Sequence, residues 1–305
     1  MRYIDAHVHI TPAHALGKKY EPAGSQQLAF GMTRKADGTI VQTLPPYMHD
    51  SQFTVETLVH MMDVYEVDRA VIMQTLMSAD NGSVADAVRA CPDRLAGAMV
   101  IEPVEDCLEQ MEYWHGRGLN VIKFEMRSYT DERCYPDVRY TDRVMMDMFR
   151  KAGELGMTVT VDPAPVDFPV YQPDALEEAV SSFPETSFVL CHLGYPQPVD
   201  TPERKERWER MLAVCAHENC HVDVSAMSDL FDAEGWPYPT ALDLFEYAVR
   251  RCGIEKFIWG SDIMGSLNRA TYPQIRDMWR RTAFLSEADL ERLYFRNAEE
   301  AYRLS

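Results

Sequence analysis

Residues 3–10 read Tyr-Ile-Asp-Ala-His-Val-His-Ile, and this stretch sets the interpretation of the whole chain. Its β-branched and aromatic residues favour a strand, which the following Thr-Pro ends. Side chains two positions apart lie on one face of a strand, so Asp5, His7 and His9 point the same way. Neighbouring imidazoles repel each other when both are protonated, whereas a divalent metal ion keeps both neutral. The stretch therefore favours a metal or catalytic site over a polar strand with two chance histidines.

Short apolar segments alternate with segments of helical periodicity along the rest of the sequence. The strand-like segments after the first lie at residues 69–74, 95–101, 120–124, 158–161, 187–191, 221–224 and 256–259. Strands that are apolar on both faces suit a parallel sheet covered by helices. Together with the first strand they predict a (β/α)8 TIM barrel that forms one domain over residues 1–305 and ends in extra helices. The alternative, a doubly wound sheet, predicts a glycine-rich loop where the sequence has His-Val-His-Ile-Thr-Pro.

The segments between the strands favour helices, with caps at several of their starts. The helices are expected at residues 54–66, 83–90, 104–115, 145–155, 174–183, 201–215 and 240–252, followed by terminal helices at 273–282 and 286–304. Ser83, Asp174 and Thr201 are expected caps among them. Residues 11–53 show no clear periodicity. Such a long connection is usually a lid or a binding loop, and a disordered surface insertion is the alternative.

The composition excludes several classes of partner. The chain is 46% hydrophobic and 26% charged, as in a globular protein, and its net charge of −18 argues against binding to nucleic acid or an anionic membrane surface. No apolar run could cross a bilayer, and the chain enters its first strand without a signal peptide. The seven scattered cysteines suit a reducing compartment, so we expect a cytoplasmic protein. Where Cys215 and Cys220 lie near His217 and His221, helix-to-strand packing is favoured over a zinc site.

Ligand-type side chains collect at the carboxyl ends of the expected strands, where the active sites of such barrels lie. In chain order they are His7, His9, Lys123, Glu125, Asp162, His192, Asp223, Ser225 and Asp262. Several unrelated strands contribute them, so a polar end that arose by accident would need several independent coincidences. The sequence thus predicts that imidazole and carboxylate groups far apart in the chain converge at one end of the barrel.

Four short motifs occur in an order typical of one known family. They are Asp-Ala-His-Val-His at residues 5–9, His192-Leu193-Gly194, Gly260-Ser261-Asp262 and Asn297-Ala298. In these motifs, and over nearly its whole length, the chain resembles the amidohydrolase-related family of metal-dependent hydrolases. The family includes lactone hydrolases of aromatic breakdown and the decarboxylases of aminocarboxymuconate semialdehyde and γ-resorcylate. The resemblance is specific for the family and not for one reaction.

The resemblance implies one divalent metal ion, zinc or manganese, bound by His7, His9 and Asp262, with His192 acting beside it. Asp162 stands where the family usually has a histidine ligand. As a fourth ligand it would complete a shell of two histidines and two carboxylates and favour manganese over zinc. Alternatively, this ligand is lost and the enzyme works without metal, as some related lactonases do. A helix cap or a loop salt bridge is the structural alternative for Asp162.

Lys123 and Arg127 are the candidate substrate-binding residues. In this branch of the family a lysine at the end of the fourth strand usually faces the pocket and binds a substrate carboxylate, and we expect this role for Lys123. Arg127 would supply a second cation. The alternatives for Lys123 are a carboxylated lysine that bridges two metal ions, a side chain that extends past the barrel rim, and an ion pair with Glu125.

The expected activity is metal-dependent hydrolysis of a small, carboxylate-bearing acid, lactone or amide, with Asp262 or His192 as the catalytic acid–base groups. The closest alternative keeps the site but removes CO2, without oxidation, from an aromatic or muconate-type acid. A non-catalytic binding barrel with a vestigial site is the alternative from another class. Barrels of this kind often form homo-oligomers, and no interface can be recognised in the sequence.

Overall fold

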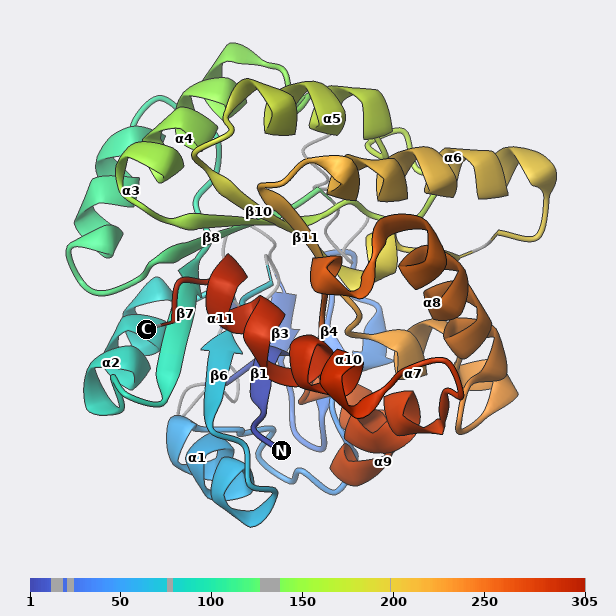
Figure 1. The fold of residues 1–305 in the computed structure, drawn as a ribbon. Helices are drawn as coiled ribbons and strands as arrows, with labels where there is room; N and C mark the ends of the chain where they lie inside the picture. Colours follow the sequence, from blue (N-terminus) through green and yellow to red (C-terminus); the bar gives the residue numbers. More distant parts are fainter. Residues whose placement is uncertain (12–18, 21–24, 76–78, 127–137, 198, 305) are drawn as a thin grey trace.

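A sheet of eight parallel strands forms the centre of the molecule (Figure 1). The computed structural model describes residues 1–11, 19–20, 25–75, 79–126, 138–197 and 199–304. The strands follow one another around the sheet in chain order and are β1 (Ile4–Val8), β6 (Arg69–Ile72), β7 (Leu95–Met99), β8 (Val121–Glu125), β9 (Thr158–Asp162), β10 (Ser187–Leu190), β11 (Cys220–Asp223) and β12 (Phe257–Ile258). Each neighbouring pair is parallel. The predicted TIM barrel is confirmed.

Main-chain hydrogen bonds between the first strand and the segment after the last strand complete the ring. The N–H of His9 donates to the carbonyl of Ile263 at 2.6 Å, and the N–H of Asp262 donates to the carbonyl of His7 at 2.8 Å. These bonds hold the His-Val-His backbone directly beside Asp262. Closure of the barrel therefore brings the first and the last of the predicted motifs together.

Helices cover the outside of the ring, as the sequence predicts (Figure 1). They are α1 (Val55–Val64), α2 (Asn81–Ala90), α3 (Cys107–His115), α4 (Arg143–Glu154), α5 (Pro173–Ser182), α6 (Pro202–Ala213) and α8 (Pro239–Cys252), with a short α7 (Met227–Leu230) that the sequence analysis missed. Thr201 caps α6 as expected, and its hydroxyl accepts the N–H of Arg204 at 3.3 Å. Two expected caps are wrong: α2 is capped by Asp80, whose carboxylate binds the N–H of Ser83, and α5 begins one residue before Asp174. Within the described residues, every helix is too short or too polar to traverse a bilayer.

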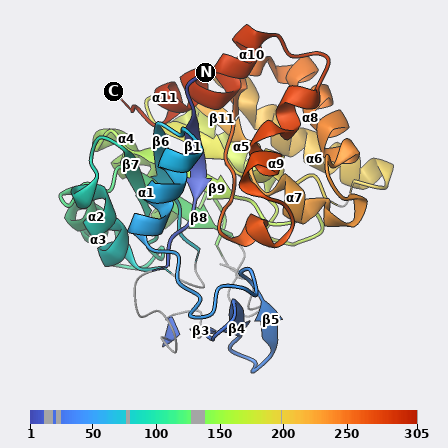
Figure 2. The same ribbon diagram turned by 90° about the horizontal axis from the view of Figure 1, so that it is seen from below.

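The connection over residues 11–53 contains a small antiparallel sheet, which the sequence analysis did not predict. Its strands are β2 (Lys19–Tyr20), β3 (Ser25–Gln27), β4 (Met32–Arg34) and β5 (Ile40–Gln42). Strands of two or three residues are too short to show a period, but the Asp37-Gly38 turn between β4 and β5 is a hairpin signal. Figure 2 shows this sheet beyond the end of the barrel toward which β1 points. The connection is therefore placed at the mouth that the candidate site residues share.

The opposite end of the barrel is closed by α11 (Asn297–Ala301), which follows the C-terminal helices α9 (Tyr272–Asp277) and α10 (Glu287–Glu291). Phe295, Ala298 and Ala301 pack against the apolar side chains inside the ring, among them Ile4 and Ala6 of β1. Figure 1 shows α11 across the centre of the barrel. These apolar residues form a plug that fills one end of the barrel, and the polar candidate site residues lie at the other end.

Asn297, part of a predicted motif, fastens this plug. It is fully buried, and its amide donates to the carbonyls of Ile254 at 2.8 Å and Phe257 at 2.7 Å. An Asn297→Ala change would leave two buried carbonyls without these donors. We expect the free energy of unfolding to fall by about 1–3 kcal/mol.

Urea denaturation followed by circular dichroism measures this change. Glu300→Ala, on the exposed face of the same helix, is the matched control and should shift the midpoint little. Equal effects of the two substitutions would show that Asn297 does not fasten the helix to the barrel.

Candidate metal and active site

Three predicted ligands from the first and last strands meet at the barrel mouth. His9 Nε2 lies 2.9 Å and His7 Nε2 3.6 Å from the same carboxylate oxygen of Asp262. One ligand atom from each residue lies within 4.8 Å of the others. Burial would raise the pKa of Asp262, but the hydrogen bond to His9 and the nearby His7 hold it well below its usual range. The three side chains therefore present two imidazole nitrogens and one anionic oxygen to a single point.

The other nitrogen of each imidazole has its own partner. His7 Nδ1 lies 3.0 Å from a carboxylate oxygen of Asp223, and His9 Nδ1 lies 3.1 Å from the carbonyl of Met73. Both partners accept hydrogen bonds, so in a neutral imidazole Nδ1 is placed as the donor and Nε2 is left as the ligand atom for an ion bound beside Asp262. Burial and the Lys123 ammonium lower the pKa of His7 to about 4, which keeps this imidazole neutral. Metal-binding histidines are oriented in this way, so the residues fit a divalent metal ion.

Asp223 contacts more residues of the site than one hydrogen bond would require. The sequence analysis expected it at the mouth but assigned it no role. One of its oxygens binds His7, and the other accepts the N–H groups of His192 at 3.0 Å and Ser225 at 3.1 Å as well as the Ser225 hydroxyl. Burial would raise the pKa of Asp223, but His7 and His192 hold it far below its usual range. A fully buried, charged carboxylate thus links strands β1, β10 and β11 at the mouth.

His192 is held in an unusual backbone conformation. His192, Leu193, Gly194 and Tyr195 have consecutive positive φ angles of 57°, 55°, 68° and 59°. Residues other than glycine rarely adopt this backbone conformation unless their surroundings enforce it. Two buried hydrogen bonds do so, from Trp208 Nε1 to the Leu193 carbonyl and from the Tyr171 hydroxyl to the Gly194 carbonyl, both of 2.8 Å. The loop therefore holds the His192 ring in one place.

The imidazole of His192 lies between two polar partners. Its Nδ1 lies 2.9 Å from the Ser225 hydroxyl, and its Nε2 lies 3.5 Å from a carboxylate oxygen of Asp162. Burial would lower the pKa of His192, but the adjacent Asp162 carboxylate raises it to about 9. Burial likewise opposes the charge on Asp162, whose pKa His192 nevertheless lowers to about 2. The two groups form a buried ion pair.

Asp162 was expected as a metal ligand. Among the described residues it belongs to neither group of side chains whose ligand atoms come close enough to hold one ion. Its carboxylate instead binds His192 and accepts the N–H of Ala164 at 3.2 Å. This arrangement corresponds to the alternative of a salt bridge: the Asp162 carboxylate at the end of β9 pairs with His192, which follows β10.

Lys123 lies inside the mouth and does not extend past the rim. It is only 2% exposed, and its ammonium lies 3.4 Å from His7 Nε2. Burial lowers the pKa of Lys123, but the surrounding acidic groups, which include Cys191, Glu125 and Asp162, raise it above its usual value. A buried cation therefore stands beside the ligand point. Arg127, the second expected cation, lies outside the described residues.

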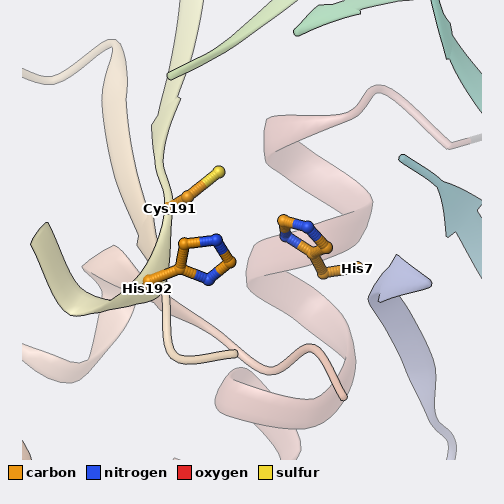
Figure 3. Close-up of side chains that lie close together, drawn as sticks. All are labelled: His7, Cys191 and His192. Carbon is orange, nitrogen blue, oxygen red and sulfur yellow. The ribbon is translucent and has the colours of Figure 1, made fainter. Parts of the chain in front are cut away.

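A second group of potential ligands contains His7, Cys191 and His192 (Figure 3). The rings of the two histidines lie side by side, with their centroids 4.9 Å apart, and the Cys191 side chain lies next to them. The sequence analysis missed Cys191 because a cysteine in an apolar strand is usually core. Burial raises the pKa of its thiol well above the usual value. Because Nδ1 of His7 is bound to Asp223, only its Nε2 can bind an ion. The two groups of potential ligands share His7, so they cannot both use it for separate ions.

The cysteines and histidines at residues 215–221 contribute to neither group of potential ligands in the described part of the chain. Cys215 and Cys220 are buried where α6 leads into β11. This placement agrees with helix-to-strand packing, which the sequence analysis favoured there.

The chain thus has a parallel β/α barrel whose potential ligand side chains lie together at the carboxyl ends of its strands, as in barrel enzymes. Comparison with known proteins then gives the family: the sequence model of the amidohydrolases matches residues 4–304, so the chain belongs to the amidohydrolase family. The predicted resemblance is confirmed. A search of curated protein sequences finds no match.

Solved structures share the fold over the whole chain. A probable 2-pyrone-4,6-dicarboxylic acid hydrolase from Acinetobacter baumannii with bound citric acid has a TM-score of 0.70 at 17% identity, covering 99% of this chain and 100% of its own. An amidohydrolase from Burkholderia multivorans with bound zinc has a TM-score of 0.72 at 15% identity, covering 100% of both chains. The 5-carboxyvanillate decarboxylase of Sphingomonas paucimobilis has a TM-score of 0.63 at 15% identity, covering 100% of this chain and 99% of its own.

The Asp223 contacts make a prediction about metal affinity. Asp223→Asn keeps the size of the side chain but removes its charge, so its amide can no longer accept from His7, His192 and Ser225 together. Loss of such a partner typically lowers metal affinity about 10–100-fold. Competition for Zn²⁺ with a chromophoric chelator measures the change, with the exposed Asp243→Asn as control. Unchanged affinity in Asp223→Asn would refute the orienting role of Asp223.

Proposed function

We propose that this protein is a metal-dependent hydrolase of a small carboxylate-bearing lactone, amide or related acid. The observation that carries the proposal is the convergence of His7 Nε2, His9 Nε2 and one Asp262 oxygen, with both Nδ1 atoms bound to acceptors. Two imidazoles and one carboxylate are a donor set of catalytic zinc sites, which keep one position open for substrate or water. Zinc is therefore the first ion to test, and manganese, which the addition of Asp162 would favour, is the second.

A divalent ion held by His7, His9 and Asp262 would supply a Lewis acid that polarises a carbonyl group and makes water more acidic. Asp262 is the carboxylate at that point, so it is placed to accept the proton that an attacking water loses. His192 would donate a hydrogen bond from Nε2, whose contact with Asp162 is long at 3.5 Å, to the carbonyl oxygen as negative charge develops there, while Ser225 holds the ring through Nδ1. Lys123 would bind the substrate carboxylate.

One observation favours a second candidate, non-oxidative decarboxylation. The Lys123 ammonium lies 3.4 Å from His7 Nε2, so a carboxylate bound to Lys123 would lie directly beside the ligand point. A decarboxylase that uses a metal ion needs the reacting carboxylate next to that ion. The bond between the ring carbon and the carboxylate would break, CO2 would leave, and His192 or Asp262 would deliver a proton to the carbon. The solved 5-carboxyvanillate decarboxylase has the same fold.

Product analysis separates the two reactions. The zinc-loaded and manganese-loaded proteins are incubated with 2-pyrone-4,6-dicarboxylic acid and with 5-carboxyvanillate in water enriched in ¹⁸O. Hydrolysis adds the heavy oxygen to the product, whereas decarboxylation releases CO2 and leaves the product without it. A panel of further lactones, amides and aromatic acids extends the test. Release of CO2 without uptake of ¹⁸O would replace the hydrolase proposal by the decarboxylase.

His9→Ala tests the metal site itself. It removes one of the two imidazole ligands, and His60→Ala on the exposed face of α1 is the matched control. We expect His9→Ala to lose bound zinc, measured by mass spectrometry after dialysis, and to lose catalytic activity by about 10²-fold or more. The control should keep both. Full activity in a metal-free His9→Ala protein would favour the metal-free lactonase.

Lys123→Met separates the roles considered for the lysine. Methionine fills a similar volume without charge, so a substrate carboxylate would lose a charge-assisted contact. We expect kcat/KM for a carboxylate substrate to fall about 10–100-fold, and that for its neutral methyl ester to change little. An equal loss for both substrates, together with loss of bound metal, would instead support a lysine that bridges metal ions.

A further inference from the structure

A small hollow lies outside the barrel mouth, between the start of α5 and one face of α6. Its volume is about 210 Å³, and Arg139, Arg207 and Arg210 are among the residues that line it. The chain carries 48 acidic and only 30 basic residues. Three arginines around one cavity are therefore a local departure from an acidic composition. None of them belongs to the site described above.

Only one of the three charges is balanced by a carboxylate among the described residues. Arg210 pairs with Asp174. Arg207 donates to the carbonyls of Phe168 at 3.2 Å and Tyr171 at 2.7 Å, which fix its guanidinium without neutralising it. At Arg139 the contact is made by the main chain, whose N–H binds the Asp142 carboxylate at 2.8 Å. The hollow therefore keeps positive charge that faces a cavity.

Two further groups suit an oxyanion that also carries a hydroxyl. Helix α5, of 10 residues, begins at the hollow with Gln172 as its N-cap and Pro173, which has no N–H; no side chain caps the N–H groups that follow, and Asp174 in this first turn is paired with Arg210. Such a helix end favours negative charge. The side-chain oxygen of Gln172 is buried and has no hydrogen-bond partner, while its nitrogen donates to the carbonyl of Val138 at 3.1 Å. A ligand that has both anionic oxygens and a hydroxyl would satisfy the arginines, the helix end and this acceptor.

We propose that this hollow is a second ligand site, which binds a small oxyanion such as hydrogen phosphate or a short hydroxycarboxylate. Pockets for drug-sized ligands have volumes of about 300–1,000 Å³, so the cavity suits a compact anion and not a nucleotide. Arg207 is the preorganised donor, because two carbonyls and the ring of Tyr171, 5.3 Å from the guanidinium carbon, hold it in place. Arg139 lines the same hollow and supplies the second unbalanced charge. The site is independent of the reaction proposed for the barrel mouth.

Calorimetric titration tests the site with two probes, inorganic phosphate and citrate, at constant ionic strength set with sodium chloride. Arg139→Gln/Arg207→Gln removes both unbalanced charges, and glutamine at residue 207 can still donate to the two carbonyls. Arg150→Gln, an exposed arginine of α4 paired with Asp147, is the matched control. We expect the double variant to bind at least about tenfold more weakly, about 1.4 kcal/mol, and the control to bind as the wild type does.

The two probes and two further variants decide between the outcomes. Saturable binding of phosphate alone assigns a phosphoryl ligand, and that of citrate alone assigns a carboxylate. Arg139→Gln by itself, at an exposed residue, gives the same direction of effect if the double variant folds poorly. Binding that survives the double change but is lost in Lys123→Met would place the anion in the barrel mouth and overturn the proposal. Absence of saturable binding to the wild type would overturn it as well.

Discussion

The buried carboxylate of Asp223 is the interaction on which the geometry of the site depends. It binds the imidazole of His7 and the main chain of His192, which are 185 residues apart in the sequence, from a third strand that lies beside β10. A carboxylate without such donors would not stay ionised in the interior. The same contacts fix which nitrogen of His7 carries the proton. One anion thus sets the position and the protonation of groups from separate strands.

The charges around Asp223 explain why the mouth is suited to a cation. Asp162, Asp223 and Asp262 are three carboxylates held charged within a small volume, and Lys123 and His192 are the cations that face them. Buried charges are tolerated only when they are paired and hydrogen-bonded. The His7 imidazole stays neutral next to Lys123, which leaves its lone pair available. The site therefore combines surplus negative charge with the Nε2 atoms of two imidazoles at one point.

The sequence predicts the barrel because each strand is an apolar run followed by a polar residue, a pattern set by local burial. It also predicts which side chains share the mouth, since parallel strands end at one edge. It does not predict the small sheet β2–β5, whose strands are too short to show a period. The partners of Asp162 and Asp223 depend on strand neighbours and ring orientations. Cys191 looks like any core residue of an apolar strand, so its place beside His7 is visible only in three dimensions.

The plug at the far end of the barrel has a consequence for biosynthesis. Ile4 and Ala6 leave the ribosome nearly 300 residues before Phe295, Ala298 and Ala301, which cover them in the folded barrel. Until then the interior of the ring stays open to solvent and to other chains. Growing chains with exposed apolar surface are prone to aggregate, and chaperones shield them. The order of synthesis therefore leaves the apolar side chains at this end of β1 without their cover until residues 295–302 have emerged.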